Sequence, residues 1–330
     1  MSEGFVEGYA LMVGVGGDLP NTVTDAEGLA NILKDGSRCG YPPDQVKLLK
    51  GENADRGKIL SALDDLARSA PPDSTVVVYF SGHGYRVTSS TGVFYYLMPH
   101  GYDLAKLFLT AISDAEFTSR LQAIKAERLV VLLDCCHAGG LGDAKAPDLE
   151  LVKSPLPPQA RSMLSQGAGR ILISSSMEDE LSYAGRPYSA FTLALIEALS
   201  GVGVAKKDGY VRVADLALHA REVVPGRTGR KQHPVLEWGG GESNNFKLAY
   251  YAGGDSEPKG LPFKGEPEIE PEPGAWSNPA NASVIFNNLN WKVGTSYQVA
   301  GDLTINNQQP GKRRRKARKA KPREGRTDTD

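Results

Sequence analysis

The stretch RLVVLLDCCHAGGL, residues 128–141, joins an apolar run to an acid, two adjacent cysteines, a histidine and small residues. The apolar part is typical of a strand buried on both faces of a parallel sheet. Because side chains alternate along a strand, Asp134 and Cys136 would share one face and Cys135 would lie on the other. We therefore expect Cys136 to be the reactive thiol and Cys135 to pack as a small apolar side chain.

A second stretch, STVVVYFSGHG at 74–84, also reads as a β-branched strand followed by a polar residue, His83. In an open parallel sheet, ligands bind where the carboxyl ends of strands meet. His83 and Cys136 would then form a pair in which the imidazole takes the proton of the thiol. Gly82 and Gly84 are predicted to form a sharp turn that exposes His83 beside the oxyanion.

The elements around these stretches alternate between strands and helices, which predicts an α/β fold with a mainly parallel sheet. The strands are expected at 9–15, 46–51, 74–80, 128–134, 170–176 and 244–252. The helices are expected at 24–35, 57–70, 111–124, 189–201 and 211–224.

YFSGHG and LLDCCHAGG resemble the paired motifs of the caspase-like cysteine peptidases (peptidase family C14). The second motif is closer to the D-x-C-H-S-G of the metacaspase and bacterial orthocaspase branch, although Cys135 and Ala138 depart from that pattern. Weaker similarities extend the resemblance over most of residues 8–250: DAEGL (25–29), YYLMPHGYD (95–103), SSSMEDELSYAG (174–185) and QHPV (232–235).

The resemblance implies a caspase-like α/β/α sandwich and assigns catalytic roles to two residues. His83 would be the general base and acid, and Cys136 the nucleophile of a Cys-His dyad. Their separation of 53 positions is close to the roughly 50 of caspases. His137, adjacent to Cys136, is expected to be structural.

The same resemblance implies a pocket for a basic side chain before the scissile bond. Asp134 would supply one carboxylate, and Asp179 or Glu180 a second. Two carboxylates hold Arg or Lys by charge-assisted hydrogen bonds. We therefore expect an endopeptidase whose protein substrates are cut after Arg or Lys.

Residues 142–168 contain four prolines and no clear period, so we expect a long exposed loop. Caspase-like chains often cut themselves in such a loop, and Lys153 and Arg161 are the expected sites, with Lys145 also available. The chemistry requires no cofactor or metal. Calcium stays open as an activator, as in many relatives, although no EF-hand spacing occurs.

The cysteine content and the distribution of apolar residues indicate a cellular compartment. The three cysteines, Cys39, Cys135 and Cys136, form no disulfide framework, which favours a reducing compartment. The N-terminus lacks the pattern of a secretory signal, and no apolar run approaches the roughly 18 residues of a membrane span. We expect a cytoplasmic protein.

The composition changes after residue 252, where the peptidase domain (1–252) is expected to end. Residues 253–274 are rich in Pro and Glu and predict a linker. Residues 275–310 alternate apolar and polar residues about Asn and Gly, which predicts a small β-hairpin that binds an activator or target. Residues 311–330 carry ten Lys/Arg against three acids, typical of a disordered solvated tail or a contact with nucleic acid or an acidic surface.

The hairpin segment resembles short modules on bacterial effector proteins of conflict and defence systems. That resemblance implies a regulated effector in bacterial defence or programmed death. The alternative is a catalytically silent caspase-like scaffold that binds partners through its C-terminal module, but retention of both His83 and Cys136 argues against it.

Two other sites are disfavoured by spacing. A metal site at Cys135, Cys136 and His137 lacks the C-x-x-C spacing that structural zinc prefers. VGVGGD (13–18) lacks the full G-x-G-x-x-G order of a dinucleotide-binding turn.

Overall fold

A computed structural model describes residues 4–90, 92–135, 144–146, 149–153, 157–167, 169–178, 180–239, 245–270, 297–300 and 302–305. The chain divides into two units, Met1–Ala275 and Trp276–Asp330. All the elements that position the candidate site belong to the first unit.

The first unit is built on a sheet with the strand order β12-β9-β6-β3-β1-β2. Its neighbouring strands run parallel except at the β12 edge, where β12 is antiparallel to β9. The mainly parallel sheet expected from the sequence is therefore confirmed. The strands are β1 (Gly8–Gly14), β2 (Val46–Lys50), β3 (Thr75–Ser89), β6 (Arg128–Cys135), β9 (Arg170–Ser174) and β12 (Val235–Trp238).

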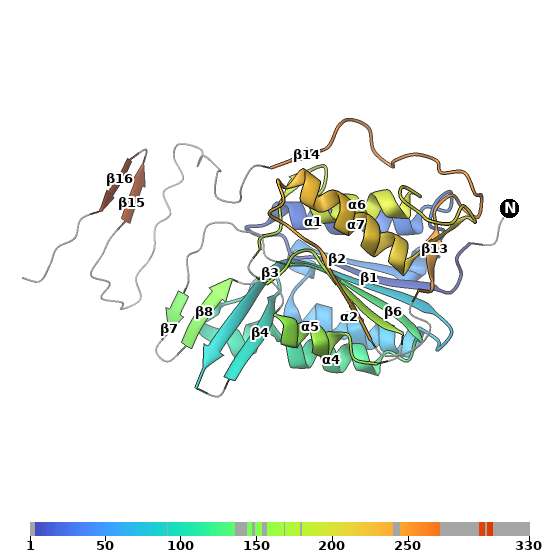
Figure 1. Ribbon diagram of the computed structural model, residues 1–330. Helices are drawn as coiled ribbons and strands as arrows, with labels where there is room; N and C mark the ends of the chain where they lie inside the picture. Colours follow the sequence, from blue (N-terminus) through green and yellow to red (C-terminus); the bar gives the residue numbers. More distant parts are fainter. Residues whose placement is uncertain are drawn as a thin grey trace, which may run out of the picture. The chain divides into compact units, whose positions relative to one another are not determined.

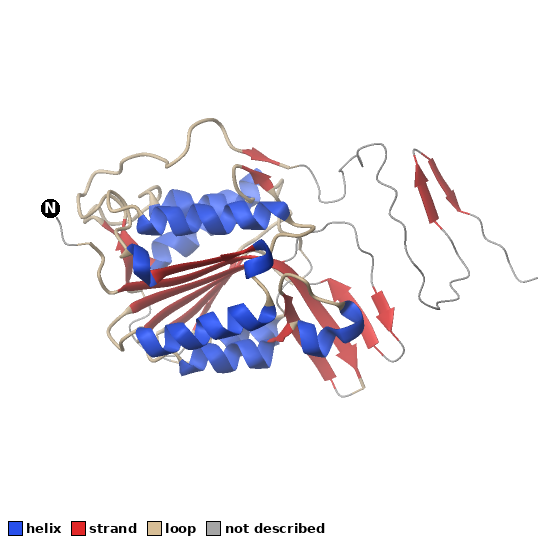
Figure 2. Ribbon diagram, turned by 180° about the vertical axis from the view of Figure 1, so that it is seen from behind, coloured by secondary structure: helices blue, strands red, loops and turns tan. Residues whose placement is uncertain are grey.

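Helices cover both faces of this sheet (Figures 1 and 2). Alternate strand residues supply two separate cores: Met12, Tyr79 and Leu132 lie in one, and Leu11 and Leu133 in the other. The first core is covered by α1 (Pro20–Lys34), α6 (Ala190–Leu199) and α7 (Val213–Arg227), and the second by α2 (Arg56–Ser69), α4 (Asp114–Ala123) and α5 (Pro158–Leu164). This is the predicted three-layer sandwich.

Strand β3 is much longer than expected and runs past the central sheet (Figure 1). Beyond Gly82 it becomes part of an antiparallel extension, pairing with β4 on one side and with β8 on the other. The sharp turn predicted at Gly82 and Gly84 is therefore wrong, because both glycines lie within the continuous strand. The extension contains β4 (Gly92–Met98), β5 (Ile112–Ser113), β7 (Ala144–Ala146) and β8 (Leu149–Lys153).

The long loop predicted at 142–168 is also wrong in part, since β7, β8 and α5 fall inside it. Helix α5 forms because PQARSML places Ala160 and Leu164 four residues apart, and both are buried against the second core. Short helices elsewhere are η1 (Pro43–Gln45), η2 (Gly51–Asn53), η3 (Leu104–Lys106) and α3 (Leu107–Thr110).

The segment after residue 252 adds to the first unit. β14 (Glu268–Ile269) pairs with β10 (Gly185–Arg186), and the carbonyl of Gly260 accepts a hydrogen bond from Arg38 (2.5 Å). The expected domain end at residue 252 therefore falls short of the compact unit, which runs to Ala275.

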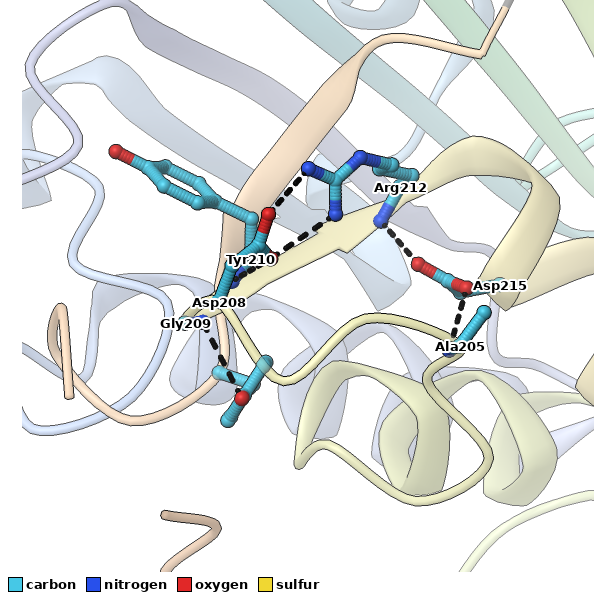
Figure 3. A network of polar contacts seen from close by, with 7 residues as sticks. Ala205, Asp208, Gly209, Tyr210, Arg212 and Asp215 are labelled. Atoms are coloured by element: carbon cyan, nitrogen blue, oxygen red, sulfur yellow. Dashed lines mark hydrogen bonds and ion pairs between the residues drawn. The ribbon is translucent and has the colours of Figure 1, made fainter. Parts of the chain in front are cut away.

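A polar network fixes the connection from α6 to α7 (Figure 3). The guanidinium of Arg212 donates to both carboxylate oxygens of Asp208, at 3.0 and 2.6 Å. Asp215 accepts from the backbone N–H groups of Ala205 (3.0 Å) and Arg212 (2.9 Å). These bonds hold β11 (Tyr210–Arg212), which pairs with β13 (Lys247–Tyr250), at the start of α7.

In the second unit the structure describes one antiparallel pair, β15 (Tyr297–Ala300) and β16 (Asp302–Ile305). A hairpin is what the alternating sequence predicts there. The basic tail at 311–330 lies outside the described residues. Among the helices described, none combines the length and the hydropathy needed to cross a bilayer.

Candidate active site

The candidate site lies at the point along β3 where its pairing with β6 ends. Gly82 is the last β3 residue paired with β6, opposite Cys135, and Tyr85 is the first paired with β8, opposite Lys153. Between them His83 pairs with β4 on one side only, opposite Met98, in the part of the chain that the structure describes. His83 therefore lies one residue along β3 from Gly82, the partner of Cys135, at the end of the strand that leads to Cys136.

His83 is buried, with 1% of its surface exposed. Its Nε2 lies 2.6 Å from Oδ2 of Asp18, a residue in the connection between β1 and α1. Its Nδ1 has no hydrogen-bond partner among the described residues. The rings of Tyr85 and Tyr102 stand edge-on to the imidazole, with centroids 6.5 and 6.4 Å away.

Gly82 serves close packing here. A Cβ at this position would stand 2.8 Å from Cγ2 of Val15, so a larger residue would push β1 away from β3. The glycine thus brings the β1–α1 connection close to His83.

Asp134 is fully buried at the end of β6, on the face covered by α1 and α6. Its Oδ1 accepts from the Ser182 hydroxyl (2.5 Å), and its Oδ2 from the hydroxyls of Ser189 (2.7 Å) and Thr192 (3.4 Å). Three neutral donors thus hold a carboxylate in a site sealed from solvent.

A second buried carboxylate, Asp25 of α1, lies beside the first. Ser189 bridges the two, since its N–H donates to Asp25 Oδ1 (2.8 Å) and its hydroxyl to Asp134. Oδ2 of Asp25 is buried and has no partner among the described residues. Burial raises the pKa of Asp25 well above its ordinary value, and the negative charge of Asp134 raises it further.

A positive charge would stabilise this buried pair of acids. Two carboxylates around one serine repel each other, and burial penalises their charged forms. A positively charged group beside the pair would lower this repulsion and could donate to Oδ2 of Asp25.

Gln232 supports the pair from behind. It is fully buried, accepts from the N–H of Tyr183 (2.9 Å), and donates to the carbonyl of Ser175 (3.0 Å) and to the Ser182 hydroxyl (3.3 Å). Since Ser182 in turn donates to Asp134, Gln232 fixes the loop that orients this carboxylate. The QHPV similarity noted in the sequence thus has a structural role.

Glu180, the other expected pocket residue, makes different contacts. Its carboxylate lies 2.5 Å from Nδ1 of His233 and accepts from the N–H groups of His233 (2.6 Å) and Met177 (3.2 Å). It is committed to holding its own loop, whereas Asp25 supplies the carboxylate next to Asp134. Asp179 lies outside the described residues.

Cys135 packs as the sequence predicts. It is 3% exposed in the second core, and burial raises the pKa of its thiol far above the ordinary range, with the charge of Asp134 adding to the effect. Such a thiol is inert near neutral pH. Cys136 and His137 lie outside the described residues, so their assignment stays a prediction.

The residues proposed for self-cleavage differ in their surroundings. Lys153 is the β8 residue opposite Tyr85, and Lys145 lies in β7. Arg161 lies in helix α5, is 9% exposed and sits 3.3 Å from a Glu237 carboxylate oxygen. A buried helical arginine does not fit the exposed loop in which cleavage was expected.

No group of three metal-ligating side chains occurs among the described residues. The buried acids Asp25 and Asp134 accept hydrogen bonds from hydroxyl and amide donors.

Sequence reasoning missed Asp18 and Asp25. Asp25 left a signal, because it occupies the apolar face of its helix together with Thr22, Ala26 and Leu29. A carboxylate at such a position is rare unless it has a partner or a function. Asp18 left none, since an Asp after two glycines is ordinary turn composition.

Comparison with known proteins identifies the family of this chain. The caspase domain family matches residues 7–239, so the chain belongs to that family. Metacaspase-4 and metacaspase-7 of Arabidopsis thaliana are 27% and 26% identical over 147 residues, which cover 41% of this chain and 34% and 35% of those proteins. The matched part is thus about a third of each plant metacaspase.

A solved structure supports the fold independently. The crystal structure of a Geobacter sulfurreducens protein gives a TM-score of 0.51 at 18% identity, covering 74% of this chain and 98% of that one. The family and the fold predicted from the sequence are confirmed.

Proposed function

We propose that this protein is a cysteine endopeptidase that cleaves after Arg or Lys, with Cys136 as the nucleophile and His83 as the general base and acid. The observation that carries the specificity is the buried pair Asp25 and Asp134, of which Asp25 keeps an open carboxylate oxygen. Membership of the caspase domain family and the similarity to plant metacaspases support the peptidase chemistry.

The proposed reaction takes place beside His83, at the end of β6. The imidazole takes the thiol proton of Cys136, and the thiolate attacks the scissile carbonyl carbon. The imidazolium then gives that proton to the leaving amine, and an acyl-enzyme forms. A water molecule, deprotonated by the imidazole, hydrolyses the thioester and restores the thiol.

The acid pair supplies selectivity by charge. An Arg side chain presents a planar fork that can serve two carboxylates, whereas Lys acts as a point charge. An Asp before the scissile bond would add a third carboxylate to a buried site that already holds two. We therefore propose an order of Arg, then Lys, with Asp rejected.

Self-processing after Lys153 is part of the proposal. The support is the register of β8, which brings Lys153 opposite Tyr85, two residues beyond His83. A noncleavable Lys153→Ala variant should stay intact under conditions in which the wild type is cut. If the wild type is cut elsewhere, N-terminal sequencing of the fragments will show it.

The wider role is proposed from the C-terminal residues. The hairpin module within 275–310 would bind an activator or target, the tail at 311–330 an acidic surface, and the protein would act in the cytoplasm as a defence or death effector. A truncation after Ala275 leaves the compact unit whole. If both peptide cleavage and the cellular phenotype survive it unchanged, the C-terminal unit is not regulatory.

The decisive experiment compares wild type and Cys136→Ala on fluorogenic peptides that differ only in a final Arg, Lys, Asp or Ala. We expect turnover by wild type on Arg and Lys peptides and at least a 1,000-fold loss in the variant. Equal turnover by both proteins, or a preference for Asp, would refute the proposal.

A further inference from the structure

The contact between His83 and Asp18 is the strongest polar interaction of the candidate base. Nε2 and Oδ2 are 2.6 Å apart, the imidazole is 1% exposed and the Asp18 side chain is 48% exposed. The carboxylate therefore meets solvent on one side and the buried ring on the other.

We propose that Asp18 is a positioning residue that converts the Cys-His dyad into an assisted dyad, an inference that rests on the peptidase function proposed above. It holds the Nε2–H tautomer of His83, which leaves the Nδ1 lone pair to accept a proton. It also stabilises the imidazolium that forms when the thiol gives up its proton.

The connection that carries Asp18 is built to hold one geometry. Gly16 and Gly17 take φ values of +70° and +69°, which side chains rarely adopt. The Thr22 hydroxyl accepts from the N–H of Gly16 (2.8 Å) and donates to the carbonyl of Leu19 (2.7 Å). Asp18 thus lies in a loop whose conformation is fixed by hydrogen bonds. Little conformational entropy is therefore lost when its side chain contacts His83.

Among the described residues, the recorded side-chain contacts of His83 are one charged group, Asp18, and two tyrosine rings. Tyr85 of β3 and Tyr102 of the β4–η3 connection are neutral at working pH. Burial raises the pKa of the Tyr102 hydroxyl, and the negative charge of Asp18 adds to that rise. Asp18 is therefore the negatively charged group that the structure records at the imidazole.

The proton balance follows from the two ring nitrogens. In the resting state Nε2–H donates to Asp18 and Nδ1 is unprotonated. Nδ1 takes the thiol proton, the ring becomes positive and Asp18 stays ionised. Nδ1 then gives its proton to the leaving amine, while the proton at Nε2 never transfers.

Replacing Asp18 should therefore lower turnover more than substrate binding. For Asp18→Asn we expect kcat/KM to fall about 10- to 100-fold near pH 7, carried by kcat. This is less than the ~10⁴-fold effect of a fully buried triad carboxylate, because solvent screens half of Asp18.

The control is Asp73→Asn, which removes the same charge from an exposed residue. Asp73 lies just before the first residue of β3. It should leave kcat/KM within twofold of wild type. Asp18→Glu, which keeps the charge, should recover part of the activity that Asp18→Asn loses. Thermal unfolding of all three variants shows whether any effect reflects folding.

Two readouts do not depend on peptide turnover. Nitrogen-15 NMR of His83, assigned with His83→Gln, should show the Nε2–H tautomer in wild type and its loss in Asp18→Asn. The rate of thiol alkylation by iodoacetamide, assigned with Cys136→Ser, should fall near pH 7 in Asp18→Asn. If no peptide is cleaved but both signals change, the peptidase function fails and the positioning role stands.

Three outcomes would overturn the inference. One is an unchanged tautomer in Asp18→Asn. Another is kcat/KM within twofold of wild type at every pH. The third is a rise in activity, which would mean that Asp18 restrains an inactive histidine.

Discussion

Replacing Asp25 by Asn should stabilise the fold and impair cleavage after basic residues. The substitution keeps the shape of the side chain and removes one of two like charges around Ser189. The new amide can also donate a hydrogen bond from the position of Oδ2, which has no partner among the described residues.

The pH dependence of the stability gain has a definite sign. The folded pKa of Asp25 is raised by burial and then by Asp134, whereas an unfolded Asp titrates near 3.9. Between those two values the folded chain holds a proton that the unfolded chain has released, so wild-type stability falls as pH rises. Asp25→Asn escapes this loss, and its advantage is absent below about pH 3 and complete above the folded pKa.

The magnitudes follow from burial and charge. Relief of one unsatisfied buried oxygen is worth about 1–3 kcal/mol, or about 2–4 °C in Tm per kcal/mol for a domain of this size. Loss of one charged hydrogen bond to a substrate guanidinium costs about 1.5–3 kcal/mol. At about 1.4 kcal/mol per decade, kcat/KM for an Arg peptide should fall roughly 10- to 150-fold.

The assay is urea unfolding at several pH values together with kinetics on Arg- and Lys-ended peptides. A variant that is more stable and less active marks a residue retained for function at a cost in stability. If Asp25→Asn is less stable than wild type at pH 7.5, or cleaves Arg peptides unchanged, the acid-pair argument is refuted.

The remaining predictions concern other acids and one thiol. Asp208→Asn should behave in the opposite way: hydrogen bonds from Arg212 lower the pKa of Asp208 to about 2, so its contribution exists above pH 4 and disappears as pH falls through 2. Because Asp208 is solvent-exposed, the cost at pH 7 should be about 0.5 kcal/mol, measured by urea unfolding at pH 7 and pH 2. Glu180→Gln should weaken its contact with His233 and cost about 1 kcal/mol without changing the preference for Arg over Ala peptides; a lost preference would return Glu180 to the pocket. Cys135→Ala should keep turnover within threefold of wild type and cost about 1 kcal/mol in packing, and a loss comparable to that of Cys136→Ala would contradict the assignment of the nucleophile.

The parts of the fold that follow a local period could be predicted from the sequence. Side-chain alternation along 128–135 places Asp134 on one face and Cys135 on the other, and the structure agrees for both. The direction in which β3 leaves the sheet could not be predicted, because glycines serve turns and close approach equally well. The structure shows that close approach applies here, because a Cβ at Gly82 would lie 2.8 Å from Cγ2 of Val15.

The acids that complete the site depend on contacts across the sheet. Asp18 and Asp25 belong to the β1–α1 region, whereas His83 lies within β3 and Asp134 near the end of β6. The strand order sets β1 beside β3 and β3 beside β6, and only that order brings the four residues to one end of the sheet. A strand order is not written in any local pattern, so these pairings appear only in three dimensions.

The two acid contacts divide the proposed chemistry between charge recognition and proton transfer. Asp25 and Asp134 are sealed among hydroxyl donors, where an unpaired charge is costly and an incoming cation is strongly favoured. Asp18 meets solvent on one side and contacts the base through one ring nitrogen. If the roles were exchanged, a buried Asp18 would compete for the proton of the imidazolium, and exposed pocket acids would recognise Arg weakly. The difference in burial between the acids is therefore what suits each to its role, and Asp25→Asn and Asp18→Asn should fail in different ways: the first in selectivity and the second in turnover.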